Sequence, residues 1–164
     1  MASSSNGSRI GNIVLMLALS NSETSYNALE WTLEHFFTPM GGGNRNQLVL
    51  IHAKRLASSV AKVSGPGATE IVPDVEAELR KVAMETVQNA KAICAAHWVT
   101  PLVEVVEGDP KVVLMEAARR YNAEILIVGS HGYGAIQRFI RGSVSNYCVN
   151  NAECPVMVVK KRKS

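Results

Sequence analysis

The chain of 164 residues has few cysteines, and none of them belongs to a C-x-x-C sequence. The three are Cys94, Cys148 and Cys154. An odd number without clustered spacing argues against both a disulfide framework and a zinc site. We therefore expect reduced, buried thiols of an intracellular protein.

Long apolar runs are also missing. The longest, Ile13–Leu19, is far shorter than the ~20 residues that a membrane span needs. Arg9 precedes it, so the core of a signal peptide is one interpretation. A strand buried on both faces of a parallel sheet is the other, and it also fits the pattern of the remaining chain. We expect no membrane association and a cytoplasmic protein, with the nucleus as an alternative location.

The body of the chain has no cluster of positive charge. Four of the 17 basic residues stand together at the C-terminus, Lys160–Lys163, and the remaining 13 are balanced by 14 acidic residues. A nucleic-acid surface requires cations gathered on the folded body. We therefore expect no nucleic-acid partner and interpret residues 162–164 as a solvated basic tail.

Short apolar segments alternate with segments of helical periodicity along the whole chain. This order predicts an α/β fold with a Rossmann-like, doubly wound, five-stranded parallel sheet, which binds ligands beyond the carboxyl ends of its strands. Residues 1–9 are expected to be disordered, residues 10–161 to form one domain, and residues 55–72 to form a long connection. The predicted strands cover residues 13–19, 48–54, 102–106, 125–128 and 155–160. The predicted helices cover residues 24–37, 73–97, a segment that starts after Asp109, and 143–151.

The most distinctive segment follows the fourth predicted strand. It reads Gly129-Ser130-His131-Gly132 and, nine residues later, Gly142-Ser143-Val144-Ser145. Glycines allow close backbone approach, and a helix N-terminus with hydroxyl side chains favours a phosphate. Glycine at a strand end and serine as a helix cap are also ordinary structural features, so composition alone leaves both interpretations open. The Walker A and dinucleotide-binding glycine patterns are both absent from the sequence.

The pattern G-x-x-G-x9-G-S, from Gly129 through Gly132 to Gly142-Ser143, is similar to the nucleotide-binding motif of the universal stress protein family. The flanking segments Ile125–Val128 and Cys154–Val159 agree with it, and Ser25–Leu33 resembles the first helix of plant, single-domain members. The resemblance extends over residues 10–161.

This resemblance implies a homodimeric sensor in stress response or signalling that binds ATP or AMP. It assigns no catalytic and no metal-binding residue, and Mg²⁺ is expected only together with bound nucleotide. The homodimer would form through the strand Pro155–Val159, and the sequence identifies no signalling partner. The implied nucleotide-binding residues lie in three groups: Ala18, Leu19 and Ser20 for the ribose side; Ala53 for the adenine; and Val128, Gly129, Gly132, Gly142, Ser143, Val144 and Ser145 for the phosphates.

One position departs from the family pattern. Ser20 stands where the family usually has an Asp, whose carboxylate can accept ribose hydrogen bonds and help to hold a divalent metal. A lost charged hydrogen bond costs roughly 1.5–3 kcal/mol, or about tenfold and more in affinity. This departure keeps open the alternative of a nucleotide-independent interaction or chaperone-like module. A slow ATP hydrolase is a further alternative, but the absent Walker lysine and Ser20 in place of the usual Asp both argue against efficient hydrolysis.

Overall fold

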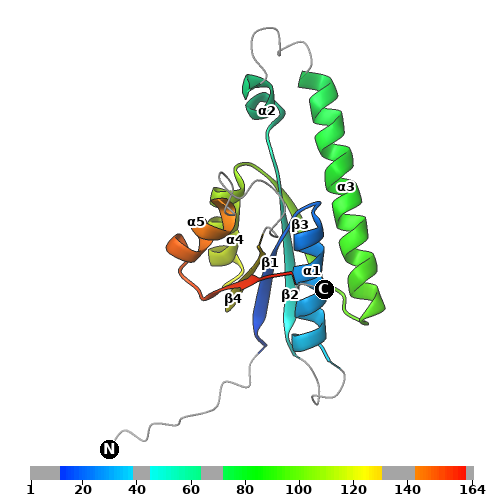
Figure 1. Ribbon diagram of the computed structural model, residues 1–164, viewed down its shortest axis with the longest axis vertical. Helices are drawn as coiled ribbons and strands as arrows, with labels where there is room; N and C mark the ends of the chain where they lie inside the picture. The colour runs from blue at the N-terminus through cyan, green and yellow to red at the C-terminus, as the bar shows by residue number, and fades with distance from the viewer. Residues whose placement is uncertain (1–11, 39–44, 64–71, 131–142, 162–164) are drawn as a thin grey trace, which may run out of the picture.

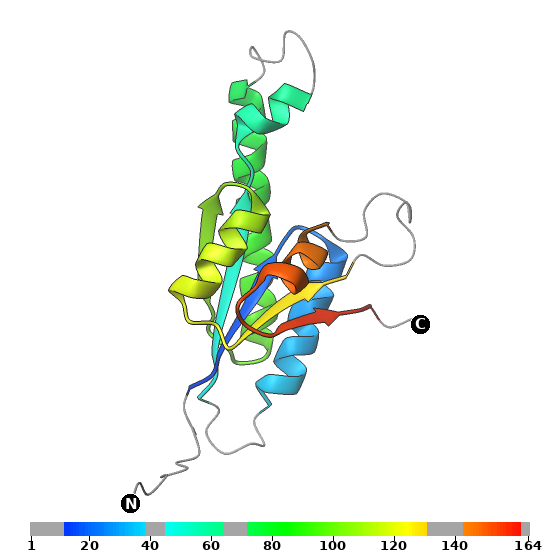
Figure 2. The same ribbon diagram turned by 90° about the vertical axis from the view of Figure 1, so that its left-hand side faces the viewer.

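A five-stranded sheet, parallel throughout, forms the centre of the protein. The computed structural model describes residues 12–38, 45–63, 72–130 and 143–161, without the side chains of residues 61–63. Within these residues the strand order is β3-β2-β1-β4-β5. Figure 2 shows β3 and β5 at opposite edges of the sheet. The strands are β1 (Val14–Leu19), β2 (Gln47–Lys54), β3 (Leu102–Glu107), β4 (Ile125–Gly129) and β5 (Val156–Val159).

Helices cover both faces of this sheet. Helices α1 and α3 pack together on one face, and α4 and α5 pack together on the other (Figure 1). The predicted doubly wound α/β fold is therefore confirmed. The helices are α1 (Glu23–Phe36), α2 (Ala57–Val63), α3 (Val72–Ala96), α4 (Pro110–Arg120) and α5 (Ser143–Asn151).

The apolar run near the N-terminus forms the central strand β1. Leu15, Met16 and Leu17 are fully buried, because successive side chains of a strand point to opposite faces and both faces are covered. Leu15 and Leu17 pack against α1 and α3, whereas Met16 packs against α4. The interpretation of this run as a strand buried on both faces is confirmed.

Side chains cap the starts of two helices, α1 and α4. The Ser22 Oγ atom accepts a hydrogen bond from the Ser25 amide at 3.2 Å, at the start of α1. Asp109 caps α4 through a 2.8 Å bond from the Lys111 amide, and Pro110 occupies the first helical position. Each cap satisfies an amide that has no partner inside its helix.

Helix α3 ends in an unusual way at Trp98. The Val99 amide bonds the Cys94 carbonyl and the Trp98 amide bonds the Ala95 carbonyl, which is a Schellman motif. Trp98 occupies the left-handed position with a φ of 59°, and its side chain is 93% exposed. Glycine or asparagine usually fills this position, because a bulky side chain is strained there.

The prediction of one uninterrupted connection over residues 55–72 is wrong. Helix α2 occupies Ala57–Val63 and packs beside the N-terminal half of α3, beyond the end of the sheet (Figure 1). The sequence pattern missed it because a two-turn helix gains most of its stability from tertiary packing rather than from propensity. The Gly65-Pro66-Gly67 part of the connection lies outside the described residues.

A search of the described helices for a membrane-spanning segment found none that is both long and apolar enough.

Candidate functional site

The carboxyl ends of β1 and β4 meet at the centre of the sheet. Leu17 pairs with Ile127, and each strand continues for two more residues, to Leu19 and Gly129 (Figure 2). The chain leaves β1 toward β2 by α1 on one face, but it reaches β4 from α4 on the opposite face. At such a reversal the two connections diverge, and this is where open parallel sheets bind ligands.

Some of the predicted site residues lie at the carboxyl ends of β1 and β4. Ala18 and Leu19 end β1, Ser20 follows it directly, and Val128 and Gly129 end β4. Three more open helix α5, which follows β4: Ser143, Val144 and Ser145. Ala53 lies near the end of β2, the strand next to β1. Gly132, Gly142 and His131 lie outside the described residues.

Gly129 is in very close contact with the start of α1. A Cβ atom at this position would lie 2.6 Å from the Thr24 carbonyl oxygen and 2.9 Å from its carbon. Both are backbone atoms, so no side-chain rotation can relieve the overlap. The absence of a side chain at Gly129 therefore allows β4 to approach α1, which is a structural reason for this glycine independent of any ligand.

Hydroxyl groups line the turn between β1 and α1. The Ser20 and Ser22 Oγ atoms are 2.9 Å apart, and the Ser22 Oγ and Thr24 Oγ1 atoms are 3.2 Å apart. The Ser25 Oγ atom accepts a 2.9 Å bond from the Ser20 amide and donates to the Ala18 carbonyl at 3.3 Å. The exposed Ser20 side chain thus presents an uncharged hydroxyl, which can bind a sugar hydroxyl but cannot neutralise a cation.

His52 lies near the end of the neighbouring strand β2, one residue before Ala53. Its Nδ1 atom donates a 2.9 Å hydrogen bond to the Leu19 carbonyl, and the residue is buried. Because the carbonyl can only accept, the hydrogen lies on Nδ1. The last carbonyl of β1 is therefore bound within the protein. Nothing in the sequence indicated this, since the two residues belong to different strands.

Lys54, directly after the predicted adenine-contacting residue Ala53, lies between two carboxylates. Its Nζ atom is 2.5 Å from the Glu76 Oε1 atom of α3 and 2.9 Å from the Glu107 Oε2 atom of β3. Hydrogen bonds to both carboxylates raise the pKa of Lys54, and the bond from Lys54 lowers the pKa of Glu76. The cluster ties α3 to the ends of β2 and β3, beside the candidate site.

An ion pair also links the start of α1 to the segment after β5. Glu23, in the first turn of α1, pairs with Lys161, which follows β5. Its carboxylate is thus engaged with a residue of the C-terminal segment. No group of three or more potential metal ligands was found among the described residues.

Several motif residues belong to the core. Val128 is buried, and the partly buried Val144 packs in the same cluster as Val128 and Cys148. The buried Val128 can therefore reach a ligand only through its backbone. The expected burial is confirmed for Cys94 and Cys148, whereas Cys154 is only partly buried. Burial raises the pKa of the Cys94 and Cys148 thiols to about 11.

Sequence comparison identifies the family. The family model of the universal stress protein family matches residues 14–160. The chain belongs to the universal stress protein family. A relative from Coxiella burnetii, Universal stress protein A homolog 2, is 32% identical over 118 residues, which cover 72% of this chain and 77% of that protein.

Other relatives match over shorter segments. An Arabidopsis thaliana protein, Universal stress protein A-like protein, is 46% identical over 54 residues, which are 33% of this chain and 31% of the relative. The chain thus spans less than a third of that plant protein.

The solved structures of family members have the same fold. An Arabidopsis thaliana universal stress protein with AMP bound matches with a TM-score of 0.65 and 24% identity, over 92% of each chain. The universal stress protein of Archaeoglobus fulgidus in complex with dAMP matches with a TM-score of 0.59 and 18% identity, over 92% of this chain and 99% of that one. At these identities the match shows the Rossmann-like fold alone.

Proposed function

We propose that this universal stress protein binds an adenine nucleotide, AMP or ATP, at the carboxyl ends of β1 and β4. The observation that supports the proposal most directly is the reversal of the strand order there, with Leu19 and Gly129 at the same level of neighbouring parallel strands. The N-termini of α1 and α5 both follow these strand ends in the chain, and helix N-termini favour phosphate groups.

The bound nucleotides of related proteins support the same choice of ligand. AMP is bound in the Arabidopsis structure and dAMP in the Archaeoglobus structure. In the proposed complex the adenine contacts the backbone of Ala53, the ribose lies near Ser20, and the phosphates lie on the segment from Gly142 to Ser145. The biological role proposed with this site is nucleotide sensing in a cytoplasmic stress response.

One observation favours the alternative of a nucleotide-independent interaction module. The contact between Gly129 and the Thr24 backbone explains the first glycine of the motif by packing alone. The motif would then be retained for architecture, and the protein would act through protein contacts. The two functions differ in whether the remaining motif residues, Gly142 and Ser143, bind a ligand.

A test of the proposal starts with the protein purified without added nucleotide. The protein is denatured, and the released small molecules are separated and identified by mass. Calorimetric titration with AMP and ATP, with and without Mg²⁺, is then carried out on the emptied protein. Near-stoichiometric release or a saturable titration supports nucleotide binding. An empty protein that gives no heat with millimolar AMP or ATP contradicts it, and phosphate release from ATP would indicate the hydrolase.

Two variants connect binding to the site. Gly142→Ala is expected to weaken nucleotide binding, because the added Cβ would meet a phosphate, whereas a purely structural turn would change only the melting temperature. Ser20→Asp is expected to strengthen nucleotide binding about tenfold by adding a charged acceptor. Ser58→Asp, on an exposed position of α2, adds the same charge elsewhere. If Ser20→Asp matches this control, the argument about Ser20 is wrong.

We also propose that the protein forms a homodimer through the edge strand β5. Strand β5 lies at one end of the strand order, and the side chain of Val158 in it is 37% exposed. An open apolar edge is prone to pair with another strand. Sedimentation of the wild-type protein as a monomer at micromolar concentration would contradict this proposal.

A further inference from the structure

The outward face of α3 has an exposed apolar centre. Met84 is 58% exposed, and Arg80 and Gln88 lie one turn before and after it. Two shallow hollows of about 450 and 340 Å³ share these three residues in their linings. We call the five residues Arg80, Lys81, Met84, Glu85 and Gln88 the α3 face.

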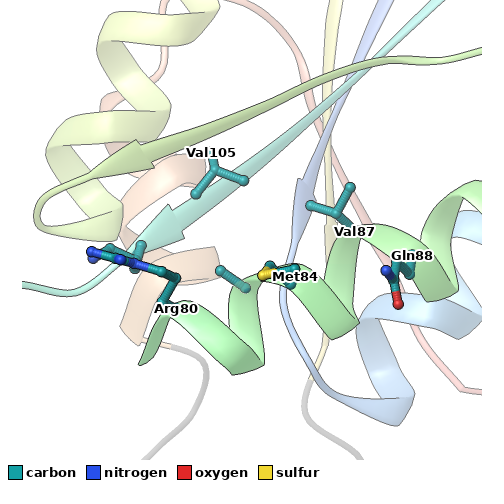
Figure 3. A pocket seen from close by; sticks show the side chains of 7 residues that line it. Arg80, Met84, Val87, Gln88 and Val105 are labelled. Carbon is teal, nitrogen blue, oxygen red and sulfur yellow. The ribbon is translucent and has the colours of Figure 1, made fainter. Parts of the chain in front are cut away.

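The larger hollow lies between α3 and the edge strand β3. Figure 3 shows Val105 of β3 opposite Met84 and Val87 of α3, with Arg80 and Gln88 toward the two ends. Val105 is 45% exposed, and Ala83 completes the apolar lining. A projecting methionine thus lies beside an apolar depression, and such a surface can fit a second copy of itself in a two-fold contact.

The charges along α3 indicate the direction of such a contact. Six exposed charged residues follow one another along the helix. In order from the N-terminus they are acidic Asp74 and Glu78, basic Arg80 and Lys81, acidic Glu85 and basic Lys91. In a parallel pair, like charges would stand level with each other. In an antiparallel pair centred near Ala83, Lys81 of each copy lies opposite Glu85 of the other, and Asp74 lies opposite Lys91.

We propose that the α3 face is a self-association surface, on which a second copy of this chain packs in an antiparallel α3–α3 contact. Met84 of each copy enters the hollow beside α3 of the other, and Lys81 of each copy pairs with Glu85 of the other. This surface is separate from any contact through β5, because β3 and β5 are opposite edges of the sheet. The proposal does not depend on nucleotide binding.

Charge reversal provides the test. Lys81→Glu places two carboxylates against each other at both ends of the two-fold contact, and Glu85→Lys places two ammonium groups there. Two attractive pairs then become repulsive, which lowers the association constant by about thirtyfold. In a mixed dimer of the two single variants, the Lys81→Glu copy carries carboxylates at positions 81 and 85, and the Glu85→Lys copy carries ammonium groups at both. Each pair then joins opposite charges, so a mixture of the two single variants is expected to regain association. The double variant Lys81→Glu/Glu85→Lys restores opposite charges in both pairs and is expected to associate like the wild type.

The measurement is sedimentation velocity of the full chain from micromolar to several hundred micromolar, in low salt and in 1 M NaCl. The wild type is expected to show an association step that each single variant loses and that the double variant regains. The matched control is Glu116→Lys, a reversal of charge on an exposed residue of α4, which is expected to keep the step. Melting curves verify that each variant is folded.

Three results would overturn the proposal. The first is that the single variants sediment like the wild type, and the second is that a folded double variant fails to regain the association step. The third is that the wild type shows no association step that is weakened by Met84→Ala. A β5-mediated dimer is unaffected by these variants, so its presence or absence does not confuse the result. A complex that forms only with another protein would also count against self-association.

Discussion

Replacement of Gly129 by alanine tests whether β4 depends on close approach to α1. The added Cβ would lie 2.6 Å from the Thr24 carbonyl oxygen and 3.2 Å from the Ser25 amide nitrogen. Real Cβ atoms essentially never lie within 3.0 Å of such an atom, so either β4 or the start of α1 must shift. Because the obstacle is backbone near a fully buried strand, the shift disturbs packing on both sides.

The expected cost follows from overpacking a site that cannot relax by side-chain rotation. Such insertions cost roughly 1–3 kcal/mol. For a chain of this length about 1 kcal/mol lowers the melting temperature by roughly 2–4 °C, so we expect a fall of roughly 2–12 °C. No left-handed backbone angle is involved at Gly129, so the whole effect is attributed to the steric overlap.

The assay is thermal and urea unfolding of Gly129→Ala beside wild type, both without nucleotide. Ser130→Ala is the matched control, because it changes the next residue without adding an atom. A wild-type melting temperature and urea midpoint for Gly129→Ala would refute the reasoning. A loss of nucleotide affinity without loss of stability would also refute it, and would instead assign Gly129 to the ligand.

Three further predictions concern stability. Ser22→Ala removes the cap of α1 and is expected to lower the free energy of chemical unfolding by about 1 kcal/mol. Ser22→Asp is expected to keep most of the stability that the cap provides. Trp98→Asn is expected to raise the unfolding free energy by about 0.5–1 kcal/mol, because asparagine tolerates the left-handed angle, as Asn122 does after α4 at a φ of 48°; an unchanged or lower value would contradict the strain argument. The lowered pKa of Glu76 means that its ion pair with Lys54 stabilises the fold above the usual glutamate pKa of 4.5 and is lost as the pH falls through the lower folded value. The free energy of unfolding in urea should therefore be higher for the wild type than for Glu76→Gln at pH 7, and this difference should shrink below about pH 4.5. A difference that is constant with pH would contradict this assignment.

The sequence predicted most of the secondary structure because the inner strands β1, β2 and β4 are buried on both faces. A continuous apolar segment such as Leu48–Ile51 has few alternatives to an internal parallel strand. The two capped helices were also predictable, since Ser22 and Asp109 act on amides only three and two residues away. Local chemistry of this kind can be read from neighbouring residues.

The missing parts of the prediction depend on contacts between distant residues. His52 bonds a carbonyl 33 residues earlier in the chain, and Lys54 bonds a carboxylate 22 residues later. In the sequence, His52 and Lys54 resemble ordinary strand or surface residues, because only the folded arrangement of the strands brings their partners next to them. Helix α2 was missed for the same reason, because its support is the flank of α3 rather than its own sequence.

The described geometry divides the motif into residues that build the fold and residues that remain for a ligand. Gly129 is needed by α1, Val128 and Val144 by the core, and the Leu19 carbonyl is bound by His52. A match to this part of the motif therefore does not by itself indicate nucleotide binding. The Ser143 side chain is exposed at the start of α5, so its hydroxyl takes no part in the buried core. Ser143→Ala consequently separates the two functions better than any glycine variant: an unchanged melting temperature with weaker AMP binding supports the nucleotide site, and unchanged binding removes the hydroxyl from it.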